Sequence, residues 1–295
     1  MTKRKTLPVA LSVAGSDSGG GAGIQADLKT FAALGVHGTS AISCLTAQNP
    51  KQVLAVEPCP PKMLRRQLEA VFAELKPAAV KTGMLFSAEN ISVVTGFFGN
   101  SKFKTENLKL IVDPVMVSTS GARLLQPAAE KKLRQKLLPL AMLVTPNLDE
   151  AEILAEQSIS SPEALRTAAR KIRSRYGCAV LLKGGHLKNS PEAIDVFYDG
   201  ETELLLTAPF VNGISTHGTG CTYSAAICAA LALGHDLPQA VEIGKHFITA
   251  AISGSYRIGK HFALGSVPLK ESASATGKTR RHSSGSDTCN CDHSR

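Results

Sequence analysis

The stretch TLPVALSVA at residues 6–14, followed by GSDSGGGAG at residues 15–23, decides the fold of this 295-residue chain. The apolar run has the length and composition of a buried strand. After the glycines, Ile24, Leu28 and Phe31 recur at the spacing of one helix face, and Gly35 marks the end of that helix. The sequence therefore predicts a strand, a glycine loop and a helix in this order.

The same alternation continues along the rest of the chain. Strands are predicted at residues 40–46, 78–81, 109–112, 141–144 and 179–182, and helices at 64–75, 91–98, 127–138, 161–175, 223–233 and 237–253. A hairpin is predicted from residues 195–198 and 203–207. We therefore predict an α/β fold with a doubly wound, mainly parallel central sheet flanked by helices, in one domain over residues 1–268.

Unusual residues follow six of the predicted strands, each at the point where the strand ends. They are the glycine loop at residues 15–23, Gln48, Met84, Asp113, Asn147 and Lys183. In open α/β sheets, ligands bind at the edge formed by the carboxyl ends of the strands. Six such features on one edge favour an enzyme over a featureless α/β domain.

The glycine loop itself contains a dinucleotide-like pattern, because GAGIQA at residues 21–26 matches G-x-G-x-x-A. An NAD site also needs an acidic residue about 20 positions further on, to hold the ribose. Residues 39–56 contain neither Asp nor Glu. We therefore exclude an NAD-dependent oxidoreductase and expect a loop whose backbone approaches a ligand, with Asp17 and Asp27 as polar contacts.

The stretch HGTGCT at residues 217–222 opens a helix made of small residues. The first N–H groups of such a helix have no partner within the helix, and its dipole favours negative charge, so we expect an anion cradle here. Cys221 lies at the same helix end, where we expect a lowered thiol pKa. A tight turn with a small core cysteine explains this motif alone about equally well.

The composition of the chain argues against several classes of protein. The net charge is +9, but no basic stripe is interleaved with aromatic residues, which argues against nucleic-acid binding. The chain lacks a membrane-length apolar run and a signal-peptide core, so no membrane partner and a cytoplasmic location are expected. The seven scattered cysteines indicate reduced thiols. We expect the Ser/Thr-rich, basic residues 269–295 to be a disordered tail.

An anion cradle, a lysine at one strand end and an aspartate at another suit phosphoryl transfer, which needs mainly positioning and charge neutralisation. Lys183 would contact phosphates, and Asp113 and Glu150 would hold a hydrated Mg²⁺ through its waters. Asn147 with Glu150 three residues later is also the pattern of a helix capping box. The two roles of Glu150 are compatible, so both stay open at this point.

The motifs as a set resemble a known family. They are residues 15–30 (GSDSGGGAGIQADLKT), 46–49 (TAQN), 81–85 (KTGML), 113–116 (DPVM), 145–150 (TPNLDE), 183–186 (KGGH) and 217–222 (HGTGCT). Together they resemble the hydroxymethylpyrimidine/phosphomethylpyrimidine kinases of thiamine biosynthesis, in the ribokinase-like superfamily. The resemblance spans residues 7–265 and does not include the tail.

The resemblance implies that ATP with Mg²⁺ phosphorylates 4-amino-5-hydroxymethyl-2-methylpyrimidine, and then its monophosphate to the diphosphate. It implies a homodimer and assigns site residues as follows: for the substrate Gly15, Asp27, Gln48, Met84 and Val115; for ATP and phosphate Asn147, Lys183, Thr216 and Thr219; for catalysis Cys221, Lys183, Gly218 and Gly220; for Mg²⁺ Asp113 and Glu150. Most of the superfamily carries Asp where this chain has Cys221. We therefore leave open whether the thiol is a base or a part of the anion hole.

Two other functions remain as alternatives. Pyridoxal kinases of the same subfamily share the glycine loop and the cradle, but they tend to carry an apolar residue in place of Gln48. A pyrimidine-binding protein without activity would need the pocket but not Lys183, Asp113, Glu150 and Cys221. The kinase of thiamine biosynthesis is therefore the favoured prediction.

Overall fold

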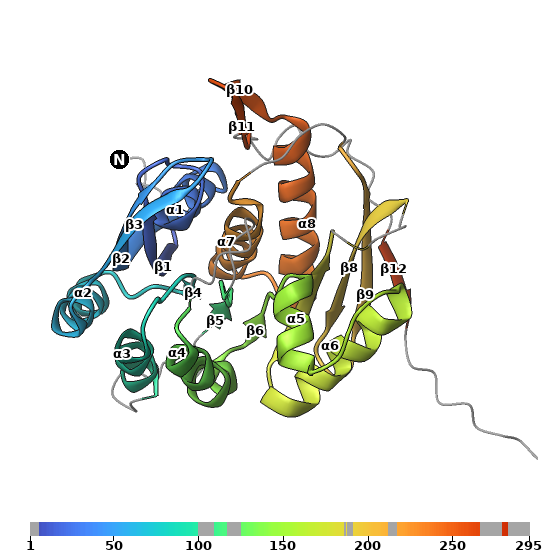
Figure 1. Cartoon of the computed structure of the whole chain (residues 1–295), viewed down its shortest axis with the longest axis horizontal. Helices are drawn as coiled ribbons and strands as arrows, with labels where there is room; N and C mark the ends of the chain where they lie inside the picture. Colours follow the sequence, from blue (N-terminus) through green and yellow to red (C-terminus); the bar gives the residue numbers. More distant parts are fainter. Residues whose placement is uncertain are drawn as a thin grey trace, which may run out of the picture.

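The structure is a computed structural model, and it describes residues 6–99, 109–116, 125–185, 187, 191–211 and 217–265 together with the backbone of 279–282. Ten strands of this described part form one sheet (Figure 1). They are β1 (Val9–Asp17), β2 (His37–Gln48), β3 (Val53–Pro58), β4 (Ala79–Thr82), β5 (Lys109–Val112), β6 (Leu143–Val144), β7 (Ala179–Gly184), β8 (Glu192–Tyr198), β9 (Glu203–Pro209) and β12 (Thr279–His282).

The sheet has the order β12-β9-β8-β7-β6-β5-β4-β1-β2-β3. The six strands from β7 to β2 are parallel, while β3, β8, β9 and β12 run antiparallel to their neighbours. The chain passes from β1 to β2 on one side and returns to β4 on the other. The strand order thus reverses beside β1, and such a reversal opens a ligand crevice at the carboxyl edge.

Helices cover both faces of the sheet, as Figure 1 shows, which confirms the predicted doubly wound α/β fold. One face carries α1 (Gly23–Ala33), α7 (Thr219–Ala232) and α8 (Leu237–Ser253). The other carries α2 (Pro61–Glu74), α3 (Ala88–Phe98), α4 (Pro127–Lys132), α5 (Leu148–Ala155) and α6 (Pro162–Tyr176). Beyond α4 the chain continues in a π-helical turn, Leu133–Leu137, and a 3₁₀ turn, Leu138–Leu140.

Helix α7, which carries the cradle, is the most enclosed of the described helices. Every residue from Thr222 to Ala232 is buried. Five of its residues are alanines, and side chains this small let the helix lie close to the sheet and to α1 and α8. This packing fixes the position of the N-terminus of α7 over the edge where the parallel strands end.

Three described strand features were missing from the sequence prediction. β3 is an edge strand whose residues are mostly exposed, so it lacks the apolar alternation that signals a strand. The short hairpin of β10 (Tyr256–Ile258) and β11 (His261–Ala263) follows α8, and β12 pairs with β9. Apart from β12, residues 266–295 lie outside the described part, so the predicted disorder of residues 269–295 stays a prediction.

Candidate active site

The glycine loop is folded around the carboxylate of Asp17, the last residue of β1. Its oxygens accept hydrogen bonds from the backbone N–H groups of Gly19 (2.8 Å), Gly21 (3.1 Å) and Ala22 (2.8 Å). Burial alone would raise the pKa of Asp17, but the hydrogen bonds from His217 and from the loop lower it below its usual value. An ionised carboxylate therefore holds the loop in shape.

The cradle, residues 217–222, lies directly against this loop. Gly218 has φ +86°, and a Cβ built on it would lie 1.8 Å from the carbonyl oxygen of Gly21. Only glycine fits there, for the backbone angle and for the space. Gly218 is the N-cap of α7, and no side chain caps this helix end. The end of α7 thus has the properties expected of an anion site.

The expectation of a lowered pKa for Cys221 is wrong. Burial raises the pKa of this thiol to about 11; Lys81 opposes the rise, whereas Asp27 and Asp113 add to it. The nearby carboxylates and the loss of water thus outweigh the helix dipole. At neutral pH Cys221 is therefore a thiol and not a thiolate in this structure.

The predicted phosphate-side residues meet next to the cradle. Lys183 Nζ lies 3.1 Å from Asp113 Oδ1, and a Cβ on Gly220 would lie 3.1 Å from the same Nζ. The hydroxyl of Thr145 donates to Asp113 Oδ1, and that of Ser224 on α7 donates to Oδ2. Although burial alone would lower it, Asp113 and Glu150 raise the pKa of Lys183, which keeps the ammonium charged.

Glu150 forms the predicted capping box with Asn147 at the start of α5. Asn147 Oδ1 accepts from the Glu150 N–H, and Glu150 Oε2 accepts from the Asn147 N–H, both at 2.9 Å. The other carboxylate oxygen, Oε1, accepts from the N–H of Met116 at 2.9 Å. Burial, with a further contribution from Asp113, raises the pKa of Glu150 to about 7, against the effect of Lys183.

Val115 lies between Asp113 and this contact, and its backbone has φ +43°. A β-branched residue in the left-handed region is strained, so the surrounding contacts must hold it there. The hydrogen bond from Met116 to Glu150 is one such contact. The predicted substrate residue Val115 is thus held at the end of β5 by the capping glutamate of α5.

The predicted substrate-side residues lie at the ends of β1, β2 and β4. A Cβ on Gly15 would lie 3.8 Å from the sulfur of Met84 and 2.8 Å from that of Cys44. The backbone of Gln48 is bonded to the glycine loop, because its N–H donates to Ser18 Oγ and its carbonyl accepts from that hydroxyl. Gly15 therefore lies beside Met84, and Gln48 lies against the glycine loop, while their assignment to the substrate stays a prediction.

Asp27 lies beneath this region and is fully buried. Its two oxygens accept from Lys81 Nζ at 3.0 and 2.8 Å, and Oδ2 also accepts from Ser12 Oγ at 2.6 Å. Lys81 belongs to the KTGML motif but was not predicted as a site residue. A lysine inside a buried strand was the available signal, because such a lysine requires a charged partner. The assignment of Asp27 to the substrate pocket stays a prediction.

A further cluster joins the two glycine motifs to Gln48. His217 Nε2 lies 2.7 Å from the side-chain amide of Gln48 and 3.2 Å from Asp17 Oδ2. These three residues belong to three separate sequence motifs, and their contact was not predicted. Among the other predicted residues, Thr219 is the first residue of α7, and Thr216 lies outside the described residues.

With this geometry in place, comparison with known proteins identifies the family. The model of the family described as phosphomethylpyrimidine kinase matches residues 17–266. The chain belongs to this family. The matched segment includes the glycine loop from Asp17 onward, all the other strand-end residues described above, and the cradle.

This kinase is similar both to hydroxymethylpyrimidine/phosphomethylpyrimidine kinases and to pyridoxal kinases. A hydroxymethylpyrimidine/phosphomethylpyrimidine kinase of Rhizobium meliloti is 49% identical over 251 residues, which cover 85% of this chain and 92% of the relative. The structure of a phosphomethylpyrimidine kinase from Clostridium difficile has a TM-score of 0.73 at 41% identity, covering 83% of this chain and 99% of that one. A Bacillus subtilis pyridoxal kinase in an ADP complex has a TM-score of 0.82 at 36% identity, covering 90% and 100%.

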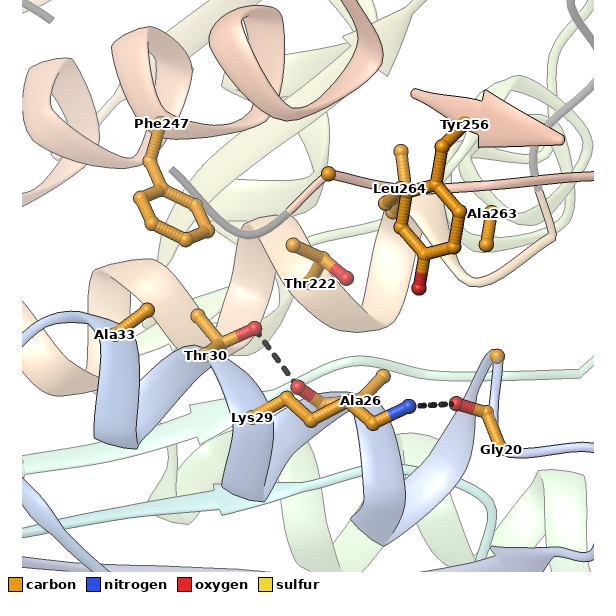
Figure 2. A pocket seen from close by; sticks show the side chains of 12 residues that line it. Gly20, Ala26, Lys29, Thr30, Ala33, Thr222, Phe247, Tyr256, Ala263 and Leu264 are labelled. Atoms are coloured by element: carbon orange, nitrogen blue, oxygen red, sulfur yellow. Dashed lines mark hydrogen bonds between the residues drawn. The ribbon is translucent and has the colours of Figure 1, made fainter. Parts of the chain in front are cut away.

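A separate cavity of about 190 Å³ lies behind the glycine loop of the kinase (Figure 2). It is bounded by α1, by Phe247 of α8 and by Tyr256 of the β10–β11 hairpin, and Lys29 beside it donates to the carbonyl of Gly20 at 2.8 Å. None of the described residues assigned to substrate, phosphate or Mg²⁺ lines this cavity. It is therefore not the candidate active site.

The described part of the kinase contains neither a membrane-spanning helix nor a cluster of metal-binding side chains. Its helices include none with the length and apolar character needed to cross a membrane. Within the same residues, no three side chains among His, Cys, Asp and Glu are grouped so that they could hold a metal ion.

Proposed function

We propose that this kinase transfers the terminal phosphate of ATP to the hydroxymethyl group of 4-amino-5-hydroxymethyl-2-methylpyrimidine, and then phosphorylates the monophosphate to the diphosphate, in thiamine diphosphate biosynthesis. The observation that carries the proposal is the meeting of three parts at one sheet edge. The end of α7 lies between Gln48 on the substrate side and the pair of Lys183 and Asp113 on the phosphate side.

On the phosphate side, Lys183 supplies a cation and the N–H groups around Gly218 and Gly220 face the transferred group. Phosphoryl transfer is accelerated mainly by such fixed charges and donors. The contact of Gly218 with Gly21 supports this role, because it fixes the cradle rigidly. Asn147, Thr216 and Thr219 complete the proposed binding of the ATP phosphates.

Mg²⁺ suits the donor set at the ends of β5 and β6. Asp113 and Glu150 are two buried carboxylates whose charges interact, and each already accepts hydrogen bonds from the protein. Because both carboxylates already accept hydrogen bonds from the protein, they suit a cation that keeps several of its own water ligands, as Mg²⁺ does. When bound, the ion would neutralise phosphate charge, and Asp113 and Glu150 would hold it through its water ligands.

Cys221 acts in this proposal as a part of the anion hole. With a pKa of about 11 its sulfur is protonated, so it contributes a weak S–H donor beside the cradle. A loose transition state makes little demand on a base, which agrees with this assignment.

On the substrate side, Gly15, Gln48, Met84, Val115 and the underlying Asp27 form the proposed pyrimidine pocket. The amide of Gln48 offers a donor and an acceptor side by side, the pairing that an aminopyrimidine edge requires. Gly15 has no side chain to come between the backbone of β1 and Met84, since a Cβ there would lie 3.8 Å from the Met84 sulfur.

The second candidate is pyridoxal phosphorylation, which the similarity to the pyridoxal kinase of Bacillus subtilis favours. Pyridoxal also carries a hydroxymethyl group on a flat ring. It lacks the aminopyrimidine edge, however, so Gln48 makes it the poorer substrate of the two.

We also propose a homodimer, on the family resemblance, and a cytoplasmic location. The five described cysteines are free thiols, as in a reducing compartment. Sedimentation velocity tests the dimer, since a single species of monomer mass would contradict it.

The activity is tested by coupled ADP release with Mg²⁺ and ATP, offering hydroxymethylpyrimidine, its monophosphate and pyridoxal in parallel. We expect turnover of both pyrimidines well above that of pyridoxal. Turnover of pyridoxal alone would refute the role of Gln48, and no ADP release from any of the three would refute a kinase of these substrates.

A further inference from the structure

The hydrogen-bond partners in the cluster of Gln48, His217 and Asp17 restrict how the side-chain amide of Gln48 can be turned. Gln48 Nε2 lies 2.7 Å from His217 Nε2, and the same His217 nitrogen lies 3.2 Å from Asp17 Oδ2. At the other end of the amide, Gln48 Oε1 lies 3.1 Å from Thr46 Oγ1. Thr46 Oγ1 also donates to the carbonyl of Ser16 at 2.9 Å. These four contacts constrain where the protons lie.

His217 Nε2 faces the carboxylate of Asp17, so this nitrogen must carry a proton and donate it. A protonated ring nitrogen has no lone pair left to accept a hydrogen bond. The amide atom 2.7 Å away therefore has to be an acceptor, which is the oxygen of Gln48 and not its nitrogen.

The hydrogen bonds of Thr46 lead independently to the same orientation of the Gln48 amide. Its hydroxyl has one proton, which it donates to the carbonyl of Ser16. The amide atom beside it must then be a donor, which is the nitrogen of Gln48. A half-turn of the amide about its last bond exchanges the two atoms and satisfies both contacts.

We propose that His217, held by Asp17, turns the amide oxygen of Gln48 toward the cradle and so determines which way round the pyrimidine binds. This inference rests on the proposed reading of the substrate by Gln48. In this orientation the amide keeps one lone pair on the oxygen and one N–H on the nitrogen free for a ligand.

The orientation of the amide fixes the orientation of the ring. The oxygen accepts from the 4-amino group, and the N–H donates to ring nitrogen N3. In the substrate the hydroxymethyl carbon is attached to C5, next to C4 and on the side away from N3. The hydroxymethyl group therefore points to the oxygen side, where His217 begins the cradle.

The turned amide would bind the ring the wrong way round. Its nitrogen would lie on the cradle side, and an aminopyrimidine would have to flip its edge to match, which moves the hydroxymethyl group away from α7. The imidazole has little room to move, since a Cβ on Gly21 would lie 3.1 Å from His217 Cδ2. His217 is thus a positioning and specificity-determining residue.

A substrate with the reversed edge tests this directly. In 5-hydroxymethyl-2-methylpyrimidin-4(3H)-one, an oxygen at C4 accepts and N3–H donates, so the molecule suits the turned amide. The measurement is kcat/KM by ADP release for the amino and the oxo compound, with the wild type and the variants His217→Met, His217→Gln, Gln48→Met and His37→Met. His37 is exposed at the far end of β2 and serves as the matched control.

We expect the wild type and His37→Met to prefer the amino compound strongly. His217→Met removes the donor at similar size and frees the amide to turn, so the preference falls about tenfold, the effect of one to two hydrogen bonds. In His217→Gln the side-chain amide nitrogen takes the position of Nε2 and keeps the preference within about threefold of the wild type.

The possible results distinguish a failure of the proposed role of His217 from a failure of the proposed role of Gln48. If Gln48→Met lowers the preference and His217→Met does not, Gln48 reads the ring but His217 does not orient it, and the inference is overturned. If both rates fall equally in His217→Met, the residue is only structural, which overturns it as well. An unchanged preference in Gln48→Met would refute the reading by Gln48 itself, and the inference with it.

Discussion

The ion pair between Lys81 and Asp27 illustrates how single side chains constrain this site. Both groups are fully buried under the substrate-side residues, with Nζ and Oδ2 separated by 2.8 Å. Removing one partner of a buried pair leaves an uncompensated charge in the interior, whereas an exposed pair contributes little. Burial is therefore what distinguishes this pair from the surface pairs of the same protein.

We predict that Lys81→Met lowers the free energy of unfolding by about 3–5 kcal/mol, because the charge of Asp27 loses its partner. Urea denaturation followed by circular dichroism measures the change. The control is Arg65→Met, which breaks the largely exposed pair with Glu69 and should cost no more than about 1 kcal/mol. Equal losses in the two variants would contradict the argument.

Cys221 gives a second prediction for one side chain. A general base contributes about 10²–10⁴-fold to the rate, but a thiol with a pKa of about 11 is not ionised at neutral pH. We expect Cys221→Ala to lower kcat by no more than about tenfold, the effect of one weak donor. Steady-state ADP release measures it, with Cys59→Ala as the control. A loss above a hundredfold would establish the thiol as the base.

At the scale of single residues, sequence patterns predicted which side chains gather but not how they pair. Asp113, Lys183 and Glu150 were expected at one edge because the carboxyl ends of parallel strands meet there. The pairing of Lys81 with Asp27 and of His217 with Gln48 joins positions 54 and 169 residues apart. No local sequence pattern predicts pairs this far apart in the chain, because which residues meet depends on the order of the strands in the sheet.

The start of α5 links a helix to a strand end. Glu150 accepts a hydrogen bond from the N–H of Asn147, the N-cap of its own helix, and another from Met116, in the segment after β5 that contains the strained Val115. A residue that serves as a helix cap in the sequence thus also holds a substrate-side backbone. This double role is what the capping-box pattern alone did not reveal.

The pKa of Glu150 predicts how stability depends on pH. Its folded-state pKa of about 7 lies above the ordinary glutamate value of 4.5, so the folded protein binds a proton that the unfolded chain releases between these values. The stability from Glu150 is complete below pH 4.5 and is lost as the pH rises through 7. The total is on the order of 3 kcal/mol.

The variant Glu150→Gln removes this titration. The unfolding free energy of the wild type minus that of the variant should therefore increase as the pH falls from 8 to about 5. Urea denaturation of the nucleotide-free proteins at four pH values gives this difference directly. A difference that stays constant, or that grows toward high pH, would contradict a raised pKa.

The N-terminus of α7 supplies the second prediction at the level of elements. Gly218→Ala should reduce kcat/KM by about 10²-fold or more, because the new Cβ would push the cradle away from Gly21 and misplace its donors. The matched control is Gly177→Ala after α6. Gly177 has a similar φ of +79° but nothing within 4 Å of its Cβ position, so that variant has the backbone strain without the clash. Similar losses of activity in both would show that strain alone is responsible.

The helices and the parallel strands were predictable because periodicity and caps agree with their burial. α8, for example, has the predicted bounds, Leu237–Ser253. The elements that escaped prediction are the ones that tertiary contacts define. β3 and the β10–β11 hairpin are short and largely exposed, and α4 ends in a π-helical turn where a regular helix was expected.

For the molecule as a whole, the sheet separates the active site from β12, the last strand of the described part. β12 pairs only with β9 among the described strands, and two strands, β9 and β8, separate it from β7, the strand that carries Lys183. We predict that removing residues 269–295 leaves kcat/KM within about twofold of the full chain, while the bared edge of β9 raises the tendency to aggregate. ADP release and light scattering measure the two effects. A large loss of activity would give the tail a role that the fold does not suggest.

The backbone contact between Gly21 and Gly218 has a consequence for the engineering of new substrates. Because the two segments touch without a side chain between them, any residue larger than glycine at position 218 would push them apart, whereas Gln48 and Met84 are proposed to contact the substrate through their side chains. A library for altered substrate choice should therefore randomise positions 48 and 84 and keep the glycines unchanged. His217 belongs to the cradle and also contacts Gln48, so a library that keeps it preserves the proposed orientation of the ring while the size of the pocket is varied.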